Sequence, residues 1–186
     1  TIKIRSGWDD EHISAEKLAK MAEEAGVAAV AVHGRTRSQF YKGLANWDII
    51  KQVVQSVNIP VIANGDVFSA KDAEAIFEKT NCAGIMIGRR AQGYPWIFKE
   101  VNEYLKNRII IKGPTYAEKI ETAIRHLELA VNYYGERHGV PIMRKHISWY
   151  LKGMPNASEI KNRVNQLTEI DSLVKLLISY QDELKS

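Results

Sequence analysis

The chain has 186 residues, of which 45% are hydrophobic and 26% are charged, and its formal net charge is +4. The sequence shows neither low complexity nor a long block of like charge, so we expect one or two folded domains with a real core. The single cysteine, Cys82, excludes a disulfide framework and a multi-cysteine metal site, and we expect no metal.

The first 90 residues alternate short apolar runs with helical patterns. The runs lie at residues 1–4, 28–32, 59–63 and 84–87, about 25 to 30 residues apart. Helical patterns lie between them: residues 14–25 ending at Gly26, residues 47–57 ending before Pro60, and a third helix capped by Ser69 with Asp72 three residues later. This alternation predicts parallel strands with helices packed outside.

The spacing also predicts which helix residues share a face. In the first helix these are Leu18, Met21, Ala22 and Ala25. In the third helix Ala73, Ile76 and Phe77 are expected to face inward.

Four β/α units occupy about a hundred residues, whereas a complete (β/α)8 barrel needs about 250. The predicted fold class is therefore α/β, the C-terminal half of a TIM barrel. The sequence starts inside a predicted strand, so we expect the chain to be the C-terminal part of a longer protein. A complete small doubly wound sheet is the alternative. A half barrel would leave strand edges open, which favours non-native dimerisation.

After Phe98 the pattern is helical throughout. Gly113 and Pro114 interrupt it, and Thr115 with Glu118 forms a capping-box sequence. Apolar residues then recur at helical spacing: Ile120, Ile124, Leu127, Ala130 and Val131; Met143, Ile147 and Leu151; Ile160, Val164 and Leu167; Leu173, Leu176, Leu177 and Tyr180. We expect an all-α bundle of about four helices, with domains at residues 1–107 and 108–186.

No apolar run approaches the roughly 18 residues of a membrane span, and the first residues lack the regions of a signal peptide. We therefore expect a cytoplasmic protein with no membrane partner. The basic excess is compatible with a nucleic-acid partner but is a weak sign of one.

Two glycine-containing turns follow the third and fourth predicted strands: Asn64-Gly65-Asp66 and Gly88-Arg89. In a parallel barrel, phosphate commonly binds at the loops after the seventh and eighth strands. Glycine lets main-chain N–H groups approach an anion closely. The paired turns therefore predict a phosphate site.

The first two predicted strands add polar residues at corresponding positions. Lys3 and Arg5 share one face of their strand, and His33 follows an apolar run. A lysine at a strand edge or a lone histidine often has only a structural role. The convergence of Lys3 and His33 with Asn64 and Arg89 is better suited to a phosphate-bearing cofactor that gains negative charge on reduction.

These motifs together resemble one family. KIRSGWDD, VAVHGRTR, IPVIANGD, GIMIGRRAQGYPWIF and RKHISWYLKG are similar, in order and spacing, to motifs of the tRNA-dihydrouridine synthases, particularly the bacterial B-type branch. The resemblance covers nearly the whole chain and corresponds to the C-terminal portion of that family. It implies an enzyme in which NADPH reduces FMN, and the flavin then delivers hydride to C6 of a uridine in the D-loop of tRNA.

The resemblance also implies roles for individual residues. Lys3 and His33 would contact the flavin ring. The flavin phosphate would lie against Asn64, Gly65, Asp66, Gly88 and Arg89. Arg5, Arg35 and Arg37 would lie near the substrate pocket, although a solvated loop is the alternative for Arg35 and Arg37.

The sequence departs from the family in two places. The catalytic cysteine of the family, which protonates uracil C5, has no counterpart here and is expected upstream of Thr1. Cys82 cannot replace it, because it precedes a strand and would lie at the opposite end from the active face, as a small buried side chain. Arg90 and Tyr94 occupy positions where many relatives carry other residues.

The helical part contains a basic segment, Arg144 to Lys152, with aromatic residues among the cations. A charged helical face is most often simply solvated. In the family this domain contacts tRNA, and basic residues beside aromatic ones suit phosphate contact and base stacking. The residues assigned to tRNA contact are Arg144, Lys145, Lys152 and Arg163.

The sequence is also compatible with two other functions. One is another FMN-dependent barrel oxidoreductase, which would not be expected to carry the RKHISWYL segment. The other is a non-catalytic RNA-binding or regulatory module. The presence of Lys3, His33 and both phosphate turns argues against the second for the parent protein, although the fragment alone is expected to be inactive.

Overall fold

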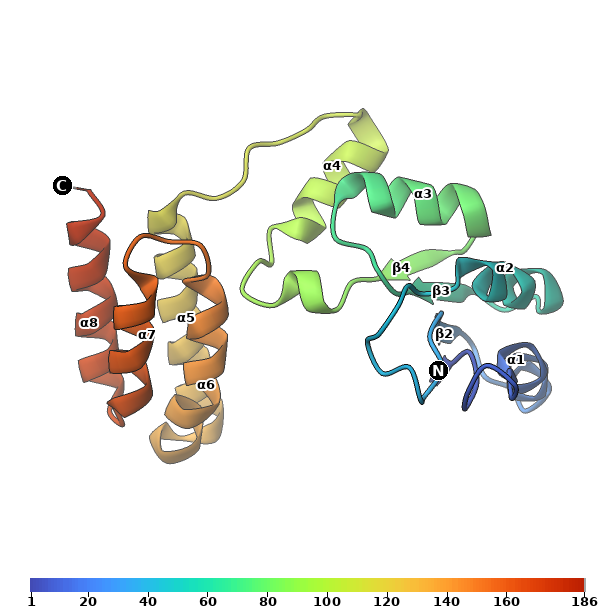
Figure 1. The fold of residues 1–186 in the computed structure, drawn as a ribbon, viewed down its shortest axis with the longest axis horizontal. Coiled ribbons are helices and arrows are strands. Elements are labelled where there is room, and N and C mark those ends of the chain that lie inside the picture. Colours follow the sequence, from blue (N-terminus) through green and yellow to red (C-terminus); the bar gives the residue numbers. More distant parts are fainter. Residues whose placement is uncertain (186) are drawn as a thin grey trace. The chain divides into compact units, whose positions relative to one another are not determined.

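The computed structural model describes residues 1–185. The chain divides into two compact units. The sheet unit contains Thr1–Arg90 and Ile97–Ile110, and the helical unit contains Ala91–Trp96 and the chain from Ile111 onward. Figure 1 labels the elements of each unit. No helix of the described part is long and apolar enough to cross a membrane.

The sheet unit is built on four parallel strands in sequential order, β1-β2-β3-β4. Their bounds are β1 Ile2–Arg5, β2 Val30–His33, β3 Val61–Asn64 and β4 Gly84–Met86. All four lie within two residues of the predicted runs. The first three extend one residue beyond the apolar run, so that each ends on a polar residue.

Four helices accompany the sheet: α1 Ala15–Glu24, α2 Trp47–Ser56, α3 Ala70–Thr80 and α4 Ile97–Asn107. Successive helices pack against one another in chain order. Val30 and Val32 share one face of β2, Val61 and Ala63 share the same face of β3, and each is at most 3% exposed. Their face therefore carries the core of this unit.

Helix caps follow the predicted sequence signals. The Ser69 side chain accepts a hydrogen bond from the main-chain N–H of Asp72 at 3.2 Å, and Asn81 ends α3 in the left-handed conformation. Gly26, just after α1, has a φ of +85°, a value that L side chains rarely adopt. Ala73 and Ile76 are fully buried on α3, as predicted.

The predicted face of α1 is wrong as a core face. Ala15 and Ala19 are fully buried, whereas Leu18 is 41% exposed and Met21 is 53% exposed. Small alanine side chains let α1 approach the sheet closely, and Met21 lines an outer groove with Ile13 and with Ile49 of α2. Apolar spacing alone does not distinguish these two faces.

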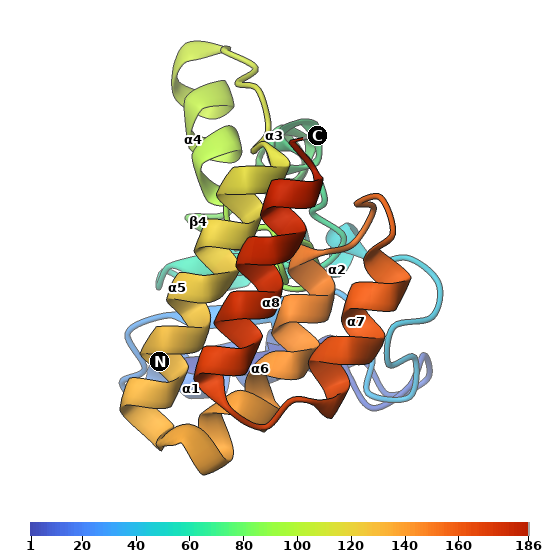
Figure 2. The same ribbon diagram turned by 90° about the vertical axis from the view of Figure 1, so that its left-hand side faces the viewer.

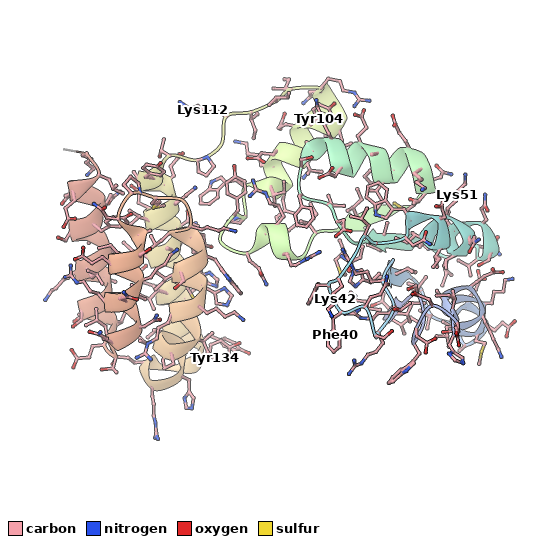
Figure 3. The ribbon with its side chains drawn as sticks, in the orientation of Figure 1. Phe40, Lys42, Lys51, Tyr104, Lys112 and Tyr134 are labelled. Carbon is pink, nitrogen blue, oxygen red and sulfur yellow. The ribbon has the colours of Figure 1, made fainter. Side chains whose placement is uncertain are left out.

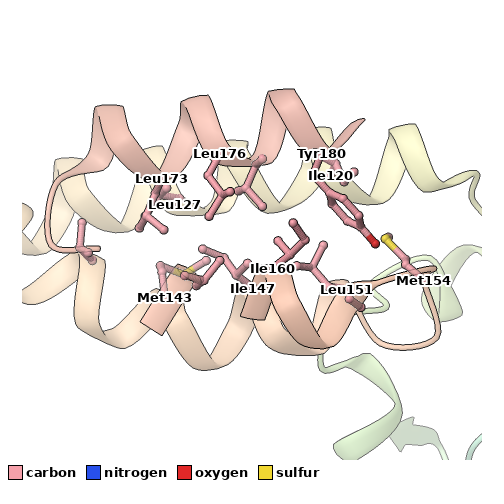
Figure 4. Packing of buried hydrophobic residues seen from close by; sticks show 14 of the residues in the cluster. Ile120, Leu127, Met143, Ile147, Leu151, Met154, Ile160, Leu173, Leu176 and Tyr180 are labelled. Atoms are coloured by element: carbon pink, nitrogen blue, oxygen red, sulfur yellow. The ribbon is translucent and has the colours of Figure 1, made fainter. Parts of the chain in front are cut away.

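The helical unit contains α5 Tyr116–Tyr134, α6 Glu136–Tyr150, α7 Ala157–Gln166 and α8 Ile170–Glu183. Figure 2 shows these four helices side by side. The Thr115 capping box is present in full. Figure 4 shows the core, which contains the residues expected from the spacing: Ile120, Leu127, Ala130, Met143, Ile147, Leu151, Ile160, Val164, Leu173, Leu176, Leu177 and Tyr180.

One short segment belongs to the helical unit although it lies between two elements of the sheet unit. This segment, Ala91–Trp96, begins at the last residue of the 3-10 helix η1 Arg89–Ala91. A Cβ on Gly93, whose φ is +69°, would lie 2.4 Å from the carbonyl carbon of Trp149. The Trp96 and Tyr150 rings meet edge to face, with centroids 6.4 Å apart. The segment is thus an integral part of the packing around the end of α6.

Candidate functional site

Polar side chains form a row at the carboxyl edge of the sheet. In the strand register Arg5 is opposite His33, and His33 is opposite Asn64. Asn64 donates a hydrogen bond from Nδ2 to the Met86 carbonyl at 2.7 Å, which extends the row to β4. Lys3 shares the face of Arg5 but lies two residues earlier, opposite Ala31. The sequence prediction of one polar edge is therefore correct in outline, with Arg5 rather than Lys3 at the level of His33.

His33 is 7% exposed and lies among cations. Burial lowers its pKa to about 4, with the charges of Lys3, Arg5 and Arg35 acting in the same direction against the opposing charge of Asp66. The imidazole is therefore neutral at pH 7 and offers one donor and one acceptor nitrogen. Burial and the charge of Arg5 also lower the pKa of Lys3.

The Asp66 carboxylate joins three loops. Its Oδ2 accepts hydrogen bonds from Arg35 Nη2 at 2.8 Å and from the Ala45 main-chain N–H at 2.7 Å, and its Oδ1 accepts one from Arg89 Nη2 at 3.0 Å. Burial raises the pKa of Asp66, but the hydrogen bonds from Ala45 and Arg35 and the charges of Arg35 and Arg89 outweigh it, so the pKa is lowered. The carboxylate is therefore ionised and fully engaged within the protein.

Arg35 is one of the most buried side chains of the chain, at 2% exposure. Besides the bond to Asp66, it donates to the carbonyls of Lys42 at 3.2 Å and Gly43 at 2.7 Å. Its Nη1 is buried without a partner among the described residues. A solvated loop is thus the wrong interpretation of Arg35, because its guanidinium holds the loop after β2 against the turn after β3.

Arg89 is fixed from three sides. Besides the bond to Asp66, its guanidinium carbon lies 4.8 Å from the centre of the Tyr41 ring and 5.3 Å from that of the Phe68 ring. Cation–π contacts of this kind hold a guanidinium in place while its remaining donors stay available. The Arg89 side chain is 38% exposed, so it can meet a ligand in a defined position.

The two glycine turns differ in what the protein itself requires. A Cβ on Gly65 would lie 2.6 Å from the Ala45 Cβ, and the φ of Gly65 is +127°, so the fold demands glycine there. The Trp47 indole also donates to the Gly65 carbonyl at 3.0 Å. A Cβ on Gly88 would meet no atom within 4 Å, and Gly88 has no positive φ. The protein leaves space beside Gly88 that a side chain could fill.

The loop after β2 carries exposed aromatic side chains and Arg37, and it is contacted by Arg5 at the end of β1. Arg5 Nη1 donates to the carbonyls of Thr36 at 2.6 Å and Phe40 at 3.2 Å. Arg37 lies over the rings of Trp8 and Phe40. Sequence reasoning missed Trp8, Phe40, Tyr41 and Phe68, and the available signal was the presence of aromatic residues among arginines in segments that follow strands.

The basic residues of the helical unit have different environments. Arg144 is half-buried and donates from Nη2 to the Leu167 carbonyl at 2.7 Å, while its Nε is buried without a partner among the described residues. Lys145 lies 5.0 Å from the centre of the Trp149 ring, and Lys152 is exposed in the turn that follows α6. Arg163 is exposed on α7, beside a groove of about 420 Å³ that also includes Lys175. Arg144 is thus bonded within the bundle, whereas the side chains of the other three are exposed.

Cys82 is 7% exposed and precedes β4, at the end of the strand opposite the polar row, as predicted. Within residues 1–185 no group of three or more histidine, cysteine or acidic residues is arranged to hold a metal ion.

A family model described as "Dihydrouridine synthase (Dus)" matches residues 1–185. "Probable tRNA-dihydrouridine synthase" of Rickettsia conorii is 47% identical over 169 residues, which are 91% of this chain and 51% of that protein. "tRNA-dihydrouridine synthase B" of Xanthomonas campestris pv. campestris is 41% identical over 184 residues, which are 99% of this chain and 55% of that protein. The chain thus spans about half the length of the curated relatives it matches.

One similar solved structure is a mandelate oxidase mutant with (S)-mandelic acid, at 15% identity and a TM-score of 0.34, covering 97% of this chain and 56% of that one.

Proposed function

Because this chain belongs to the dihydrouridine synthase family, we propose that it forms half of an FMN-binding (β/α)8 barrel followed by a tRNA-binding helical domain. The proposed domains are residues 1–107 and 108–186. The strand order supports the barrel: a doubly wound sheet reverses its order at a switch point, whereas these four parallel strands follow one another without reversal.

The space at Gly88 carries the cofactor proposal. A glycine that the protein itself does not require suggests that another molecule approaches the main chain there. Arg89, the next residue, is held by Asp66 and two aromatic rings with part of its guanidinium exposed. These features fit a phosphate group. We propose that Asn64, Gly65, Gly88 and Arg89 hold the FMN phosphate and that Asp66 acts by positioning Arg89.

Bound FMN, reduced by NADPH, would supply the hydride that converts uridine to 5,6-dihydrouridine in the D-loop of tRNA. The residues of this chain would orient the bound flavin and neutralise its negative charge. The neutral His33 ring can donate a hydrogen bond without adding a positive charge to the site. Lys3, which lies two residues before the level of His33 in the strand register, adds a second nitrogen donor. Arg5, Arg35 and Arg37 shape the loop beside the substrate.

Protonation of uracil C5 needs an acid that this chain does not place at the polar row. Cys82 is buried at the amino end of β4, so its thiol cannot reach the carboxyl edge. We therefore propose that a residue of the other barrel half supplies this proton and that the chain alone does not turn over. A tRNA substrate also implies a cytoplasmic location.

A pair of glycine substitutions tests the cofactor site. In a protein with the complete barrel, Gly88→Ala should leave the free energy of unfolding within about 0.5 kcal/mol and weaken FMN binding, measured by quenching of flavin fluorescence, by about tenfold or more. Gly65→Ala should destabilise the fold by at least about 1 kcal/mol, because its φ is positive and its space is filled. Unchanged FMN affinity in a folded Gly88→Ala protein would contradict the proposal.

A further inference from the structure

Two exposed aromatic rings enclose an arginine beside the polar row. The guanidinium carbon of Arg37 lies 4.6 Å from the centre of the Phe40 ring and 5.5 Å from that of the Trp8 ring. Trp8 is 65% exposed and Phe40 is 54% exposed. We call Trp8, Arg37 and Phe40 the arginine sandwich. Figure 3 shows Phe40 and its neighbour Lys42 extending outward from the loop.

The protein holds these exposed side chains in place. The Arg37 N–H donates to the Gly7 carbonyl at 2.9 Å, and the Ser38 N–H donates to the Trp8 carbonyl at 2.9 Å, so two segments are joined by their main chains. Arg5 fixes the Phe40 carbonyl. Phe40 has a φ of +50°, a conformation that a bulky residue rarely adopts. An exposed ring held in a strained conformation indicates a function for the ring.

No charged group of the described residues pairs with Arg37, so its guanidinium can bind a ligand. Within residues 1–185 its guanidinium makes no hydrogen bond or ion pair, so its donors are unused although its position is fixed. Asp9, the residue after Trp8, accepts hydrogen bonds from His12 and the Glu11 N–H, and Asp10 and Glu11 are exposed. The cations Arg5, Lys42 and Arg89 belong to the same set of loops.

The location of the sandwich connects it to the proposed reaction. Arg5, which fixes Phe40, is the register partner of His33, and the Ser6 N–H donates to the His33 carbonyl at 3.0 Å. We propose that the arginine sandwich binds unpaired nucleotides of the RNA substrate next to the reacting uridine. The outer faces of Trp8 and Phe40 stack on bases, and Arg37 binds a phosphate. This inference rests on the proposed function.

Unpaired RNA suits this surface better than duplex RNA does. In a helix the faces of the bases are covered by their neighbours, whereas bases in loops can be splayed out and stacked on aromatic side chains. Stacking tolerates any base, because every base has a π-face. The sandwich therefore recognises that the target uridine lies in a loop, and the sequence around that uridine matters less.

The test uses this chain and two RNA probes: a fluorescent stem-loop with uridines in its unpaired loop, and the perfect duplex of the same stem. Trp8→Ala, Phe40→Gly and Arg37→Gln should each weaken binding of the stem-loop by about fivefold or more and leave duplex binding nearly unchanged. Phe40→Gly accepts the positive φ and so keeps the loop conformation. Phe98→Ala, which removes a comparably exposed ring (47%) from α4, is the matched control and should bind the stem-loop normally.

Three results would overturn the inference: stem-loop affinity that matches the wild type in folded variants, equal losses for stem-loop and duplex, or unchanged RNA affinity together with lost self-association, which would assign the face to a second copy of the chain. FMN binding, measured in the complete-barrel protein, separates this inference from the proposed function. If only the sandwich is wrong, the variants keep flavin and bind the stem-loop as the wild type does. If the proposed function is wrong, the unmodified protein fails to bind flavin.

Discussion

Replacing Asp66 tests whether one carboxylate holds three loops together. The Arg35–Asp66 pair is buried, with side-chain exposures of 2% and 13%. Removing one partner of a buried pair costs about 3–5 kcal/mol, because the other charge is left uncompensated. The half-exposed Arg89 adds at most about 1 kcal/mol. Asp66→Ala should therefore lower the free energy of unfolding by about 3–5 kcal/mol.

Asp66→Asn should be milder, because the amide keeps one acceptor oxygen for Arg35 or Ala45. A hydrogen bond to a charged group contributes about 1.5–3 kcal/mol and a neutral one about 0.5–1.5, so the expected loss is about 1–2 kcal/mol from Arg35. The matched control is Asp48→Asn, whose carboxylate is 66% exposed and pairs with Lys79 on the surface. That change should cost less than about 1 kcal/mol.

The assay is urea unfolding followed by far-UV circular dichroism, with amide hydrogen exchange at Ala45 as a local measure of the loop. The pKa of Asp66 is lowered on folding. Its contribution is therefore present above the unfolded pKa of about 3.9 and is lost as pH falls through the folded pKa. The difference in the free energy of unfolding between the wild type and Asp66→Asn should become smaller below about pH 4. An Asp66→Ala loss no larger than that of Asp48→Asn would refute the reasoning.

Three further predictions concern His33 and the basic residues of the helical unit. Since the folded pKa of His33, about 4, lies below its unfolded value of about 6.5, the unfolded chain binds the proton first as pH falls. The free energy of unfolding should therefore decline from about pH 6.5 to pH 4, and His33→Gln should remove part of that decline. An NMR titration that places the pKa of His33 near about 6.5 would contradict this prediction. Replacing Lys145, Lys152 and Arg163 together with alanine should weaken tRNA binding and flatten its salt dependence at unchanged stability, because fewer counterions are released. Arg144→Ala should instead destabilise the bundle by about 1–3 kcal/mol, since it removes the bond to Leu167. If the triple variant bound tRNA with the salt dependence of the wild type, Lys145, Lys152 and Arg163 would be solvated residues with no contact to tRNA.

The strands and the bundle core were predictable because each depends on a short periodic pattern. Short runs followed by a polar residue locate β1 to β3, the apolar run at residues 84–87 locates β4, and the spacing from Ile120 to Tyr180 locates the helical core. The polar row was predictable for a related reason: parallel strands bring their carboxyl ends to one edge. The exchange of Lys3 for Arg5 at the level of His33 was not, since it depends on the register between strands.

The partners of individual side chains were beyond the sequence. An aspartate in a glycine turn looks like part of a phosphate loop, and only the positions of Arg35 and Arg89 show that it joins loops. No propensity predicts a left-handed Phe40. Arg144 and Lys145 are adjacent in one basic segment, yet one faces Leu167 and the other Trp149, because neighbouring residues on a helix point in different directions.

The assignment of Ala91–Trp96 to the helical unit affects how the protein can be divided for experiments. A truncation beginning at Ile111 follows sequence order but discards Trp96, whose ring meets Tyr150, and Gly93, which packs on the end of α6. Such a piece would expose an aromatic surface that is covered in the longer chain. Any RNA binding or aggregation at that surface would be an artefact of the truncation. A truncated variant should instead carry residues 91–96 attached to the helical piece, or it should keep both units.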